Sequence, residues 1–372
     1  MRIFTLVAAA LATAACSSAS GPKPAELQRL EKPQEVRVLW SARIGYADRF
    51  VFFPAVVGDA VFAAARDGTV VRLDAAAKGA ERWRVTLERK LSAGVGASER
   101  TAVVATEDGD VFALSAADGK QLWHARVSSE VLAPPALANG VVLVRSVDNR
   151  IFAFDEADGK RRWVYQRAPA SLIVRSPAGL AIVGDTVFAG FSGGKLAAIA
   201  LSNGGVRWES TVAIPKGSTE LERVTDVVGE PVVQGREVCA AAYQGRVGCF
   251  DLTNGRQVWA RELSSLTGVT VDARYAFVSD DRGAVHQLDR SNGRSIWKQD
   301  KLAYRQLSVP APLGNVVAVG DFEGYVHFLA RDSGAFVARY SSGGGAVRAA
   351  PLALAASLLI QTQDGTLVAL AL

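Results

Sequence analysis

The chain has little of the material from which catalytic and metal sites are usually built. Its 372 residues include three histidines, three cysteines and one methionine. Neither an HExxH nor a CxxC motif occurs, so common metal-ligand spacings are missing. His286 and His327 occupy equivalent places in a repeat described below, and His124 follows a repeated tryptophan, which favours structural roles for all three histidines. We therefore predict that the protein is not an enzyme and uses neither metal nor cofactor.

Long apolar runs and blocks of like charge are also missing. No later window offers the roughly 20 uninterrupted apolar residues that a transmembrane helix needs. The formal net charge is +5, yet no run of five or more basic residues exists, so a nucleic-acid partner is not expected. The chain is rich in glycine, with 35 residues, and 49% of its residues are hydrophobic. This composition favours a β-rich fold with many turns.

The first sixteen residues have the pattern of a secretory signal. A short positive start, Met1-Arg2, precedes a mostly apolar stretch that is too short to span a bilayer. Small residues before the lone Cys16 resemble the lipobox of bacterial lipoproteins, with Thr13 where such boxes usually have leucine. The resemblance implies that Cys16 is acylated and becomes the mature N-terminus. The alternative is an ordinary signal cleaved elsewhere, which would leave Cys16 without a role.

The residue after Cys16 and the segment that follows it bear on location. Ser17, in place of aspartate, resembles outer-membrane rather than inner-membrane sorting, with the protein facing the periplasm. Residues 17–35 are rich in Ser, Pro, Lys and Glu, and we predict that they form a flexible tether. The remaining residues, 36–372, are assigned to the folded body.

An internal repeat covers that body. Seven tryptophans recur at intervals of roughly forty residues. They are Trp40, Trp83, Trp123, Trp163, Trp208, Trp259 and Trp297. The phrase before each tryptophan except the first has one form, as in DGDVFALSAADGKQLW and QGRVGCFDLTNGRQVW. A further copy, EGYVHFLARDSGAFVA, has Ala338 at the tryptophan position, and the last, DGTLVALAL, ends the chain.

Each phrase contains a glycine turn, a strand, an Asp/Asn-Gly turn and a strand with tryptophan, and another apolar strand precedes it. Four short strands per repeat of this length are typical of a propeller blade, so eight phrases predict an eight-bladed β-propeller. Asp74, Asp155, Asp251 and Asp289 end the same strand in four repeats and are predicted to cap turns. The tryptophans are predicted to fill the spaces between blades.

The two ends of the chain complete each other. The last phrase lacks a tryptophan strand, whereas residues 36–40, which end in Trp40, have no phrase before them. We therefore predict that the N-terminal strand becomes the outermost strand of the C-terminal blade and closes the ring.

Cys239 and Cys249 lie in two strand-like runs on either side of Gln244-Gly245. A hairpin there would place the two thiols opposite each other, and an oxidising periplasm permits a disulfide. Because cross-strand geometry is demanding, two free buried thiols remain the alternative.

The repeat phrase resembles the tryptophan-docking motif of quinoprotein dehydrogenases, which use pyrroloquinoline quinone. Those enzymes are longer and carry a vicinal disulfide over the quinone, whereas Cys239 and Cys249 are not adjacent. A signal with a lipobox, a tether, eight such blades and no catalytic set more closely resemble the BamB family, a lipoprotein of the outer-membrane β-barrel assembly machine. SLIVRS at Ser171 to Ser176 resembles the Leu-x-Leu-Arg loop of that family. STELERVTDV at Ser218 to Val227 resembles its STE…R…SDV segment.

The resemblance implies a monomeric scaffold within a hetero-complex that binds a POTRA domain of BamA, the central barrel-assembly subunit. By position, Leu172, Val174 and Arg175 match the docking loop and Asp226 matches an acidic contact, while Val228 stands where a second acid is expected. The two longest tryptophan intervals flank Trp208, which places the extra length in 164–180 and 209–230. Long loops on a rigid scaffold often bind partners.

Two alternatives to this docking site remain at the level of sequence. Leu172 and its neighbours could form an inner strand of their own blade. The protein could also bind nascent outer-membrane proteins directly, through exposed strand edges or channel loops.

Overall fold

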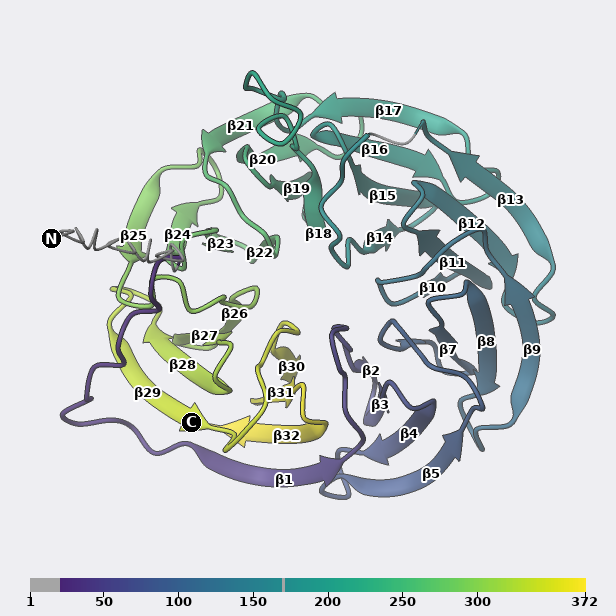
Figure 1. Cartoon of the computed structure of the whole chain (residues 1–372), viewed down its shortest axis with the longest axis horizontal. Coiled ribbons are helices and arrows are strands. Elements are labelled where there is room, and N and C mark those ends of the chain that lie inside the picture. Colours follow the sequence, from purple (N-terminus) through teal and green to yellow (C-terminus); the bar gives the residue numbers. More distant parts are fainter. Residues whose placement is uncertain (1–20, 169–170) are drawn as a thin grey trace, which may run out of the picture.

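The strands form eight antiparallel four-stranded sheets arranged in a ring (Figure 1). The computed structural model describes residues 21–168 and 171–372, so the predicted signal and Cys16 lie outside the described residues. Each sheet is one blade, and its strands follow one another in the sequence except where the ring closes. The prediction of an eight-bladed propeller is therefore confirmed. No helix in these two ranges is long and apolar enough to cross a membrane.

The strands are numbered along the chain, and those of each blade are named in order from the centre of the ring to its rim. Blade 1 consists of β2 (Ala55–Val57), β3 (Ala60–Ala64), β4 (Thr69–Asp74) and β5 (Ala80–Thr86), and blade 2 of β6 (Gly96–Ala97), β7 (Thr101–Ala105), β8 (Asp110–Ser115) and β9 (Gln121–Arg126). Blade 3 consists of β10 (Ala136–Ala138), β11 (Val141–Ser146), β12 (Arg150–Asp155) and β13 (Arg161–Gln166), and blade 4 of β14 (Leu180–Val183), β15 (Thr186–Phe191), β16 (Lys195–Ala200) and β17 (Val206–Thr211). Blade 5 consists of β18 (Val227–Gln234), β19 (Glu237–Ala242), β20 (Arg246–Asp251) and β21 (Gln257–Glu262), and blade 6 of β22 (Val269–Val271), β23 (Tyr275–Ser279), β24 (Val285–Asp289) and β25 (Ser295–Gln299). Blade 7 consists of β26 (Ala311–Leu313), β27 (Val316–Gly320), β28 (Tyr325–Ala330) and β29 (Phe336–Ser341), and blade 8 of β30 (Leu352–Leu354), β31 (Ser357–Gln361), β32 (Thr366–Ala371) and β1 (Arg37–Arg43).

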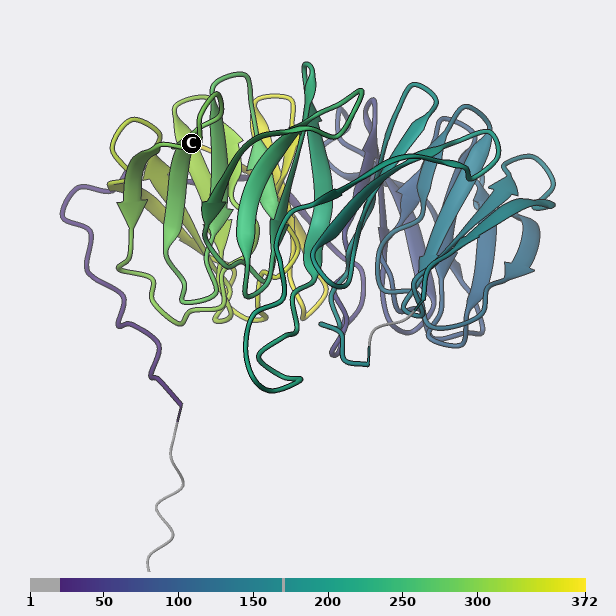
Figure 2. The same cartoon turned by 90° about the horizontal axis from the view of Figure 1, so that it is seen from above.

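The two faces of the ring carry different connections. Neighbouring strands alternate in direction, so the turn between the third and the outermost strand of a blade lies on one face of the ring. The link from the outermost strand to the next blade lies on the other face. We call these the turn face and the link face. The link face is the lower one in Figure 2.

Each tryptophan lies on the outermost strand of its blade and packs against the turn of the next blade. The indole N–H of Trp259, for example, donates a hydrogen bond to the carbonyl oxygen of Arg290 over 2.5 Å. Gly293 packs against the Trp259 indole so closely that a Cβ atom on residue 293 would lie 2.5 Å from Trp259 Cε3. The φ angle of Gly293, 72°, is also one that favours glycine. The Asn-Gly turn of one repeat and the tryptophan of the preceding one are therefore two halves of a single contact between blades.

Blade 8 closes the ring through β1, as predicted. Arg37 pairs with Ala371 and Arg43 with Thr366 in an antiparallel ladder between β1 and β32. The end of β32 and the start of β1 lie where another blade has its glycine turn, so an indole on blade 7 would have no such turn to pack against. Ala338 occupies that position, fully buried, in a cluster that also includes Val36.

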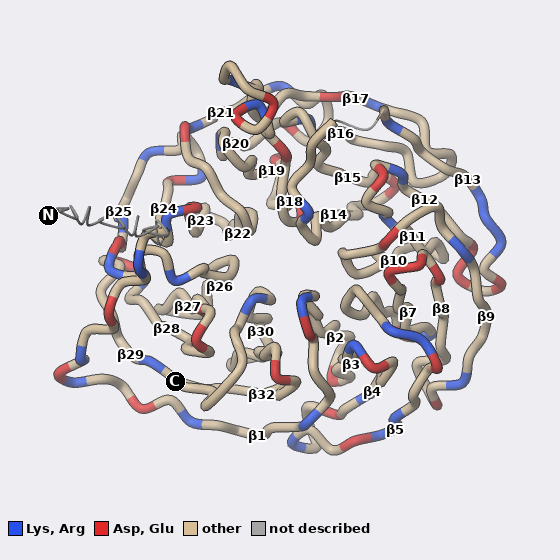
Figure 3. Tube along the Cα trace, in the orientation of Figure 1, with Lys and Arg blue, Asp and Glu red and all other residues tan. Residues whose placement is uncertain are grey.

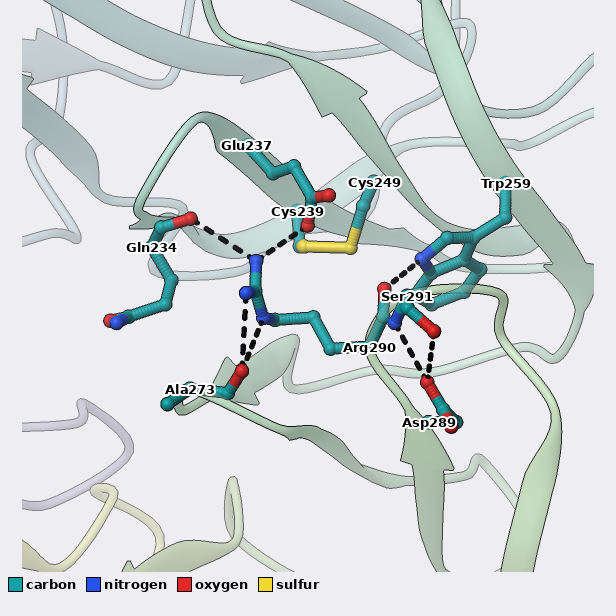
Figure 4. Close-up of a disulfide and its surroundings, with 9 residues drawn as sticks. All are labelled: Gln234, Glu237, Cys239, Cys249, Trp259, Ala273, Asp289, Arg290 and Ser291. Atoms are coloured by element: carbon teal, nitrogen blue, oxygen red, sulfur yellow. Dashed lines mark hydrogen bonds and ion pairs between the residues drawn. A yellow bond between two sulfur atoms is a disulfide. The ribbon is translucent and has the colours of Figure 1, made fainter.

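Blade 5 carries the two cysteines directly opposite each other. Cys239 on β19 pairs with Cys249 on β20, and the structure joins them in a disulfide with Cα atoms 4.0 Å apart (Figure 4). Beside it, Arg290 donates a hydrogen bond to the Gln234 carbonyl and forms an ion pair with Glu237 over 2.6 Å. Glu237 and the two sulfurs lie close enough to suggest a metal site, but bonded sulfurs offer no thiolate.

The segment before β1 lies against blade 7. The Gln34 N–H donates to the Val337 carbonyl over 2.9 Å, and the Ala25 N–H donates to the Ala303 carbonyl over 2.8 Å. Leu27 between them packs against a buried cluster at blades 6 and 7. We call residues 25–36 the strap. The prediction of a flexible tether for 17–35 therefore needs correction over residues 25–34, because their contacts are far away in sequence and no repeat signals them.

A buried charged cluster of blade 7 holds the strap. Arg305, 3% exposed, donates from Nε to Asp321 over 2.7 Å, from Nη1 to the Ala25 carbonyl over 3.0 Å, and also pairs with Glu323. Arg339 donates from Nη1 to the Gln28 carbonyl over 2.9 Å and from Nε to His327 Nδ1 over 3.1 Å. Because Nδ1 accepts, His327 is neutral, and its Nε2 donates to Asp321 over 2.9 Å.

The neutral state of His327 predicts a dependence of stability on pH. Burial lowers the pKa of His327, and the nearby Asp321 carboxylate opposes that shift. The unfolded chain then takes up a proton as the pH falls below about 6.5, whereas the folded chain does so only at lower pH. The contribution of His327 to the free energy of unfolding is therefore complete above that value and lost as the pH falls towards the lowered pKa.

We expect the stability advantage of the wild type over the His327→Gln variant to shrink between pH 7 and pH 5. Urea unfolding at the two pH values measures it, and a constant difference would contradict the assignment. His124→Gln, at an exposed rim position, is the matched control.

Candidate partner-docking surface

Two long links on neighbouring blades dominate the link face. Residues 167–179 connect β13 to β14, and residues 212–226 connect β17 to β18. Both project from the lower side of the ring in Figure 2. These are the segments in which the tryptophan intervals predicted extra length, so that prediction is confirmed. Figure 3 shows basic and acidic residues interspersed around the ring, with no single basic side.

The first link is irregular backbone in its described part. Residues 171–179 contain no strand, and β14 begins only at Leu180, so the alternative of an inner strand is wrong for Leu172 and Val174. Leu172 is 47% exposed and Ile173 is 40% exposed. Val174 is half-buried. On the second link, Ile214 and Leu221 are more exposed still.

Asp226 joins the two links. Its carboxylate accepts a hydrogen bond from the Val174 N–H over 2.6 Å, and its side chain is buried. Burial raises the pKa of Asp226, while the Val174 and Gly193 N–H groups oppose that shift. The sequence resemblance implied an acidic contact with a partner at this position. The structure instead directs the carboxylate inward, where it fixes the backbone of the first link.

Arg175 is held by groups of the protein itself. Its guanidinium forms a two-pronged ion pair with Glu130, with Nε 3.1 Å from Oε2. It also lies 5.4 Å from the centre of the Phe50 ring, which Arg66 approaches to 4.4 Å. This pairing fixes the planar guanidinium before any partner arrives. The exposed part of Arg175 is thus presented in one orientation beside Leu172 and Ile173.

A shallow hollow that is open to solvent lies beneath the first link. Its walls include Arg145, Asn149, Ile173, Arg175, Ser192 and Asp226. Arg145 stacks 5.1 Å from the Phe191 ring centre and donates only a long bond of 3.4 Å to the Ala178 carbonyl. Burial lowers the pKa of Arg145 to about 10, against the pull of Asp226. Arg145 is therefore charged at neutral pH and has spare capacity to bind a carboxylate.

Sequence reasoning missed several residues of this surface. Glu130 and Phe50 lie on the links that enter blades 3 and 1, Arg145 lies on β11 of blade 3, and nothing in the repeat marks them. Val228, where a second acid was expected, is 1% exposed in β18, and burial there explains an apolar side chain. Of the residues named from sequence, Leu172, Val174, Arg175 and Asp226 all lie on or beside one patch. We call Leu172, Ile173, Arg175, Ile214 and Leu221 the docking patch.

The other sequence candidates have structural surroundings. His286 pairs with Asp280 over 2.8 Å, and His124 pairs with Asp110 over 2.9 Å, each within its own blade. The four aspartates that end strands accept hydrogen bonds from N–H groups two or three residues ahead, for example Asp74 from Ala77 over 3.0 Å. Their predicted role as turn caps is confirmed.

Comparison with known proteins identifies a set of similar chains. A family model described as outer membrane protein assembly factor BamB matches residues 66–299. The protein of that name from Bordetella pertussis is 44% identical, over 96% of this chain and 94% of the relative. Its counterpart from Pseudomonas aeruginosa is 42% identical, over 98% of this chain and 97% of the relative.

Solved structures show the same architecture. The crystal structure of BamB from Moraxella catarrhalis matches with a TM-score of 0.84 at 28% identity, over 91% of this chain and 100% of that one. Quinohemoprotein alcohol dehydrogenase from Comamonas testosteroni matches with a TM-score of 0.73 at 12% identity, over 90% of this chain and 76% of that one. At that identity, the second likeness concerns the fold alone.

Proposed function

This chain belongs to the family of the outer membrane protein assembly factor BamB, and from this premise we propose that it is a non-catalytic scaffold of the machine that assembles outer-membrane β-barrels. Its docking patch binds a POTRA domain of BamA, and the assembled complex assists the folding and insertion of outer-membrane proteins. The protein is anchored to the outer membrane by acylation of Cys16 and faces the periplasm.

The observation that carries this proposal is the exposure of large apolar side chains on long links. Leu172, Ile173, Ile214 and Leu221 are 40 to 70% exposed on links that a rigid ring supports. Burial of such side chains against a partner removes apolar surface from water, which favours binding. Asp226 supports the arrangement from inside, because its hydrogen bond keeps the Val174 backbone in place.

The charges of the site indicate the chemistry of the partner surface. Arg175 is already oriented by Glu130, and Arg145 lies in the hollow with few hydrogen-bond acceptors. A partner that inserts an acidic side chain beside an apolar patch would satisfy both guanidinium groups. We therefore propose that the docking domain of the partner offers an apolar ridge bordered by at least one carboxylate.

Charge and polarity reversal at the patch tests the proposal. Leu172→Asp buries an unpaired charge in the interface, and Arg175→Glu opposes the partner carboxylate. We expect each change to weaken binding by at least about 2 kcal/mol, which is roughly thirtyfold. Co-purification of BamA from solubilised outer membranes, followed by titration with its isolated periplasmic region, measures the effect.

The matched control is Val206→Asp, which places the same charge on an exposed apolar residue at the rim of blade 4. This variant should bind BamA as the wild type does. The melting temperatures of Leu172→Asp and Val206→Asp should stay close to that of the wild type, because both side chains are exposed. Arg175→Glu also loses the ion pair with Glu130 and faces that carboxylate, so we expect a lower melting temperature for this variant and compare its binding only at temperatures where it is folded. Undiminished capture of BamA by both patch variants would rule out this docking site.

A further inference from the structure

The strap crosses the rim of the ring from one face to the other. Val36, next to β1, lies near the turn face, where Gln34 bonds to Val337 at the start of β29. Ala25 lies on the link face, because its partner Ala303 belongs to the link between β25 and β26. The described chain begins below that same face in Figure 2. The strap thus leaves the ring on the side that carries the docking patch.

Several independent contacts keep the strap in this path. Two main-chain hydrogen bonds hold its ends, and Arg305 and Arg339 each donate to one of its carbonyl oxygens. Arg305 is itself fixed by Asp321, which is fully buried. Leu27 adds an apolar contact on blades 6 and 7. These contacts with blade 7 and the neighbouring blade 6 therefore determine the path of the strap.

The length of the segment between Cys16 and the strap limits how the ring can turn relative to a membrane that holds Cys16. Ala25 follows Cys16 by nine positions, and an extended chain of that length spans at most about 30 Å. Without the strap, the free segment would run from Cys16 to Val36 and could span about 70 Å. A segment of about 70 Å would let either face of the ring turn towards the bilayer. A segment of about 30 Å that starts on the link face does not.

We propose that the strap orients the propeller on the membrane, with the link face and its docking patch turned towards the lipid surface. This inference rests on the proposed lipid anchor at Cys16. It assigns the strap and the Arg305–Asp321 pair a role in positioning that is independent of any protein partner. The partner would then meet the docking patch on the membrane side of the ring.

Energy transfer from a protein label to labelled lipid tests this orientation without BamA. The full-length acylated protein is placed in vesicles of phosphatidylethanolamine and phosphatidylglycerol that contain an acceptor-labelled lipid. A donor is attached either at Ile214→Cys on the link face or at Ser202→Cys on the turn face of the same blade. Both native residues are exposed, and the only described native cysteines are buried in the disulfide.

We expect higher transfer from position 214 than from position 202. Leu27→Asp, which alters the strap but no residue of the blades, should remove that difference. Equal transfer from positions 202 and 214 in the protein with the native strap would overturn the orienting role. A difference that persists in the Leu27→Asp variant would do the same, and in both cases the proposed anchor would stand. Absence of transfer from both positions would instead refute the anchor, and this inference with it.

Discussion

Replacing Asp321 by alanine should lower the free energy of unfolding by about 3 to 5 kcal/mol, because removal of one partner leaves a buried charge uncompensated. Asp321 is 0% exposed and receives hydrogen bonds from Arg305 and His327 on one oxygen and from the Glu323 and Tyr325 N–H groups on the other. Alanine can accept none of these bonds. Arg305, 3% exposed, would keep only Glu323 as a carboxylate partner.

The matched control changes the other carboxylate that pairs with Arg305. The side chain of Glu323 is 46% exposed, so its ion pair competes with water. We expect Glu323→Gln to cost about 0 to 1 kcal/mol. Chemical denaturation of the three proteins at neutral pH measures both effects. Equal losses for the two variants would show that burial of Asp321 does not set its contribution.

Replacing Trp259 by alanine should cost about 3 to 5 kcal/mol, because the change leaves a large cavity between blades 5 and 6. The indole is 6% exposed, lies against Gly293 and donates to the Arg290 carbonyl. The surrounding turn cannot collapse into the space without breaking its own hydrogen bonds. We also expect the loss to be visible as a lower melting temperature.

Val258 provides the control for this cavity. It precedes Trp259 on β21, points to the outside of the ring and is 44% exposed. Val258→Ala should change stability by no more than about 0.5 kcal/mol. If Trp259→Ala were as mild as Val258→Ala, the indole would not be the main filler of this contact between blades.

The ring itself could be predicted from the sequence, because each repeat carries its own turn residues and its own tryptophan. Even the exception at Ala338 was visible, although its cause was not. The structure supplies that cause, since the end of β32 and the start of β1 replace there the turn that an indole would need. Periodic local signals therefore sufficed for the number of blades and for their closure.

The docking patch was predictable only in part. The intervals around Trp208 indicated where the long links lie, and a family resemblance indicated Leu172 and Arg175. The inward direction of Asp226 was not predictable, because it depends on the path that residues 171–178 take across a neighbouring link. The pairing of Arg175 with Glu130 likewise joins residues 45 positions apart, on loops without a repeat pattern.

The strap is the clearest case of a structure that local patterns cannot reveal. Its composition is that of free chain, and its contacts with Arg305 and Arg339 span 280 and 311 positions. No strand alternation or turn motif marks residues 25–34. The signal resides instead in blade 7, where Arg305, His327 and Asp321 are buried together beside the half-buried Arg339.

The pairing of β1 with β32 also determines at which stage of folding the ring can close. Arg43 and Thr366 lie side by side although 323 positions separate them, and bringing ends that far apart together costs about 5 kcal/mol of chain entropy. Almost the whole chain must therefore be available before β1 finds its partner. Until then, blade 8 lacks its outermost strand and β1 lacks its pairing partner.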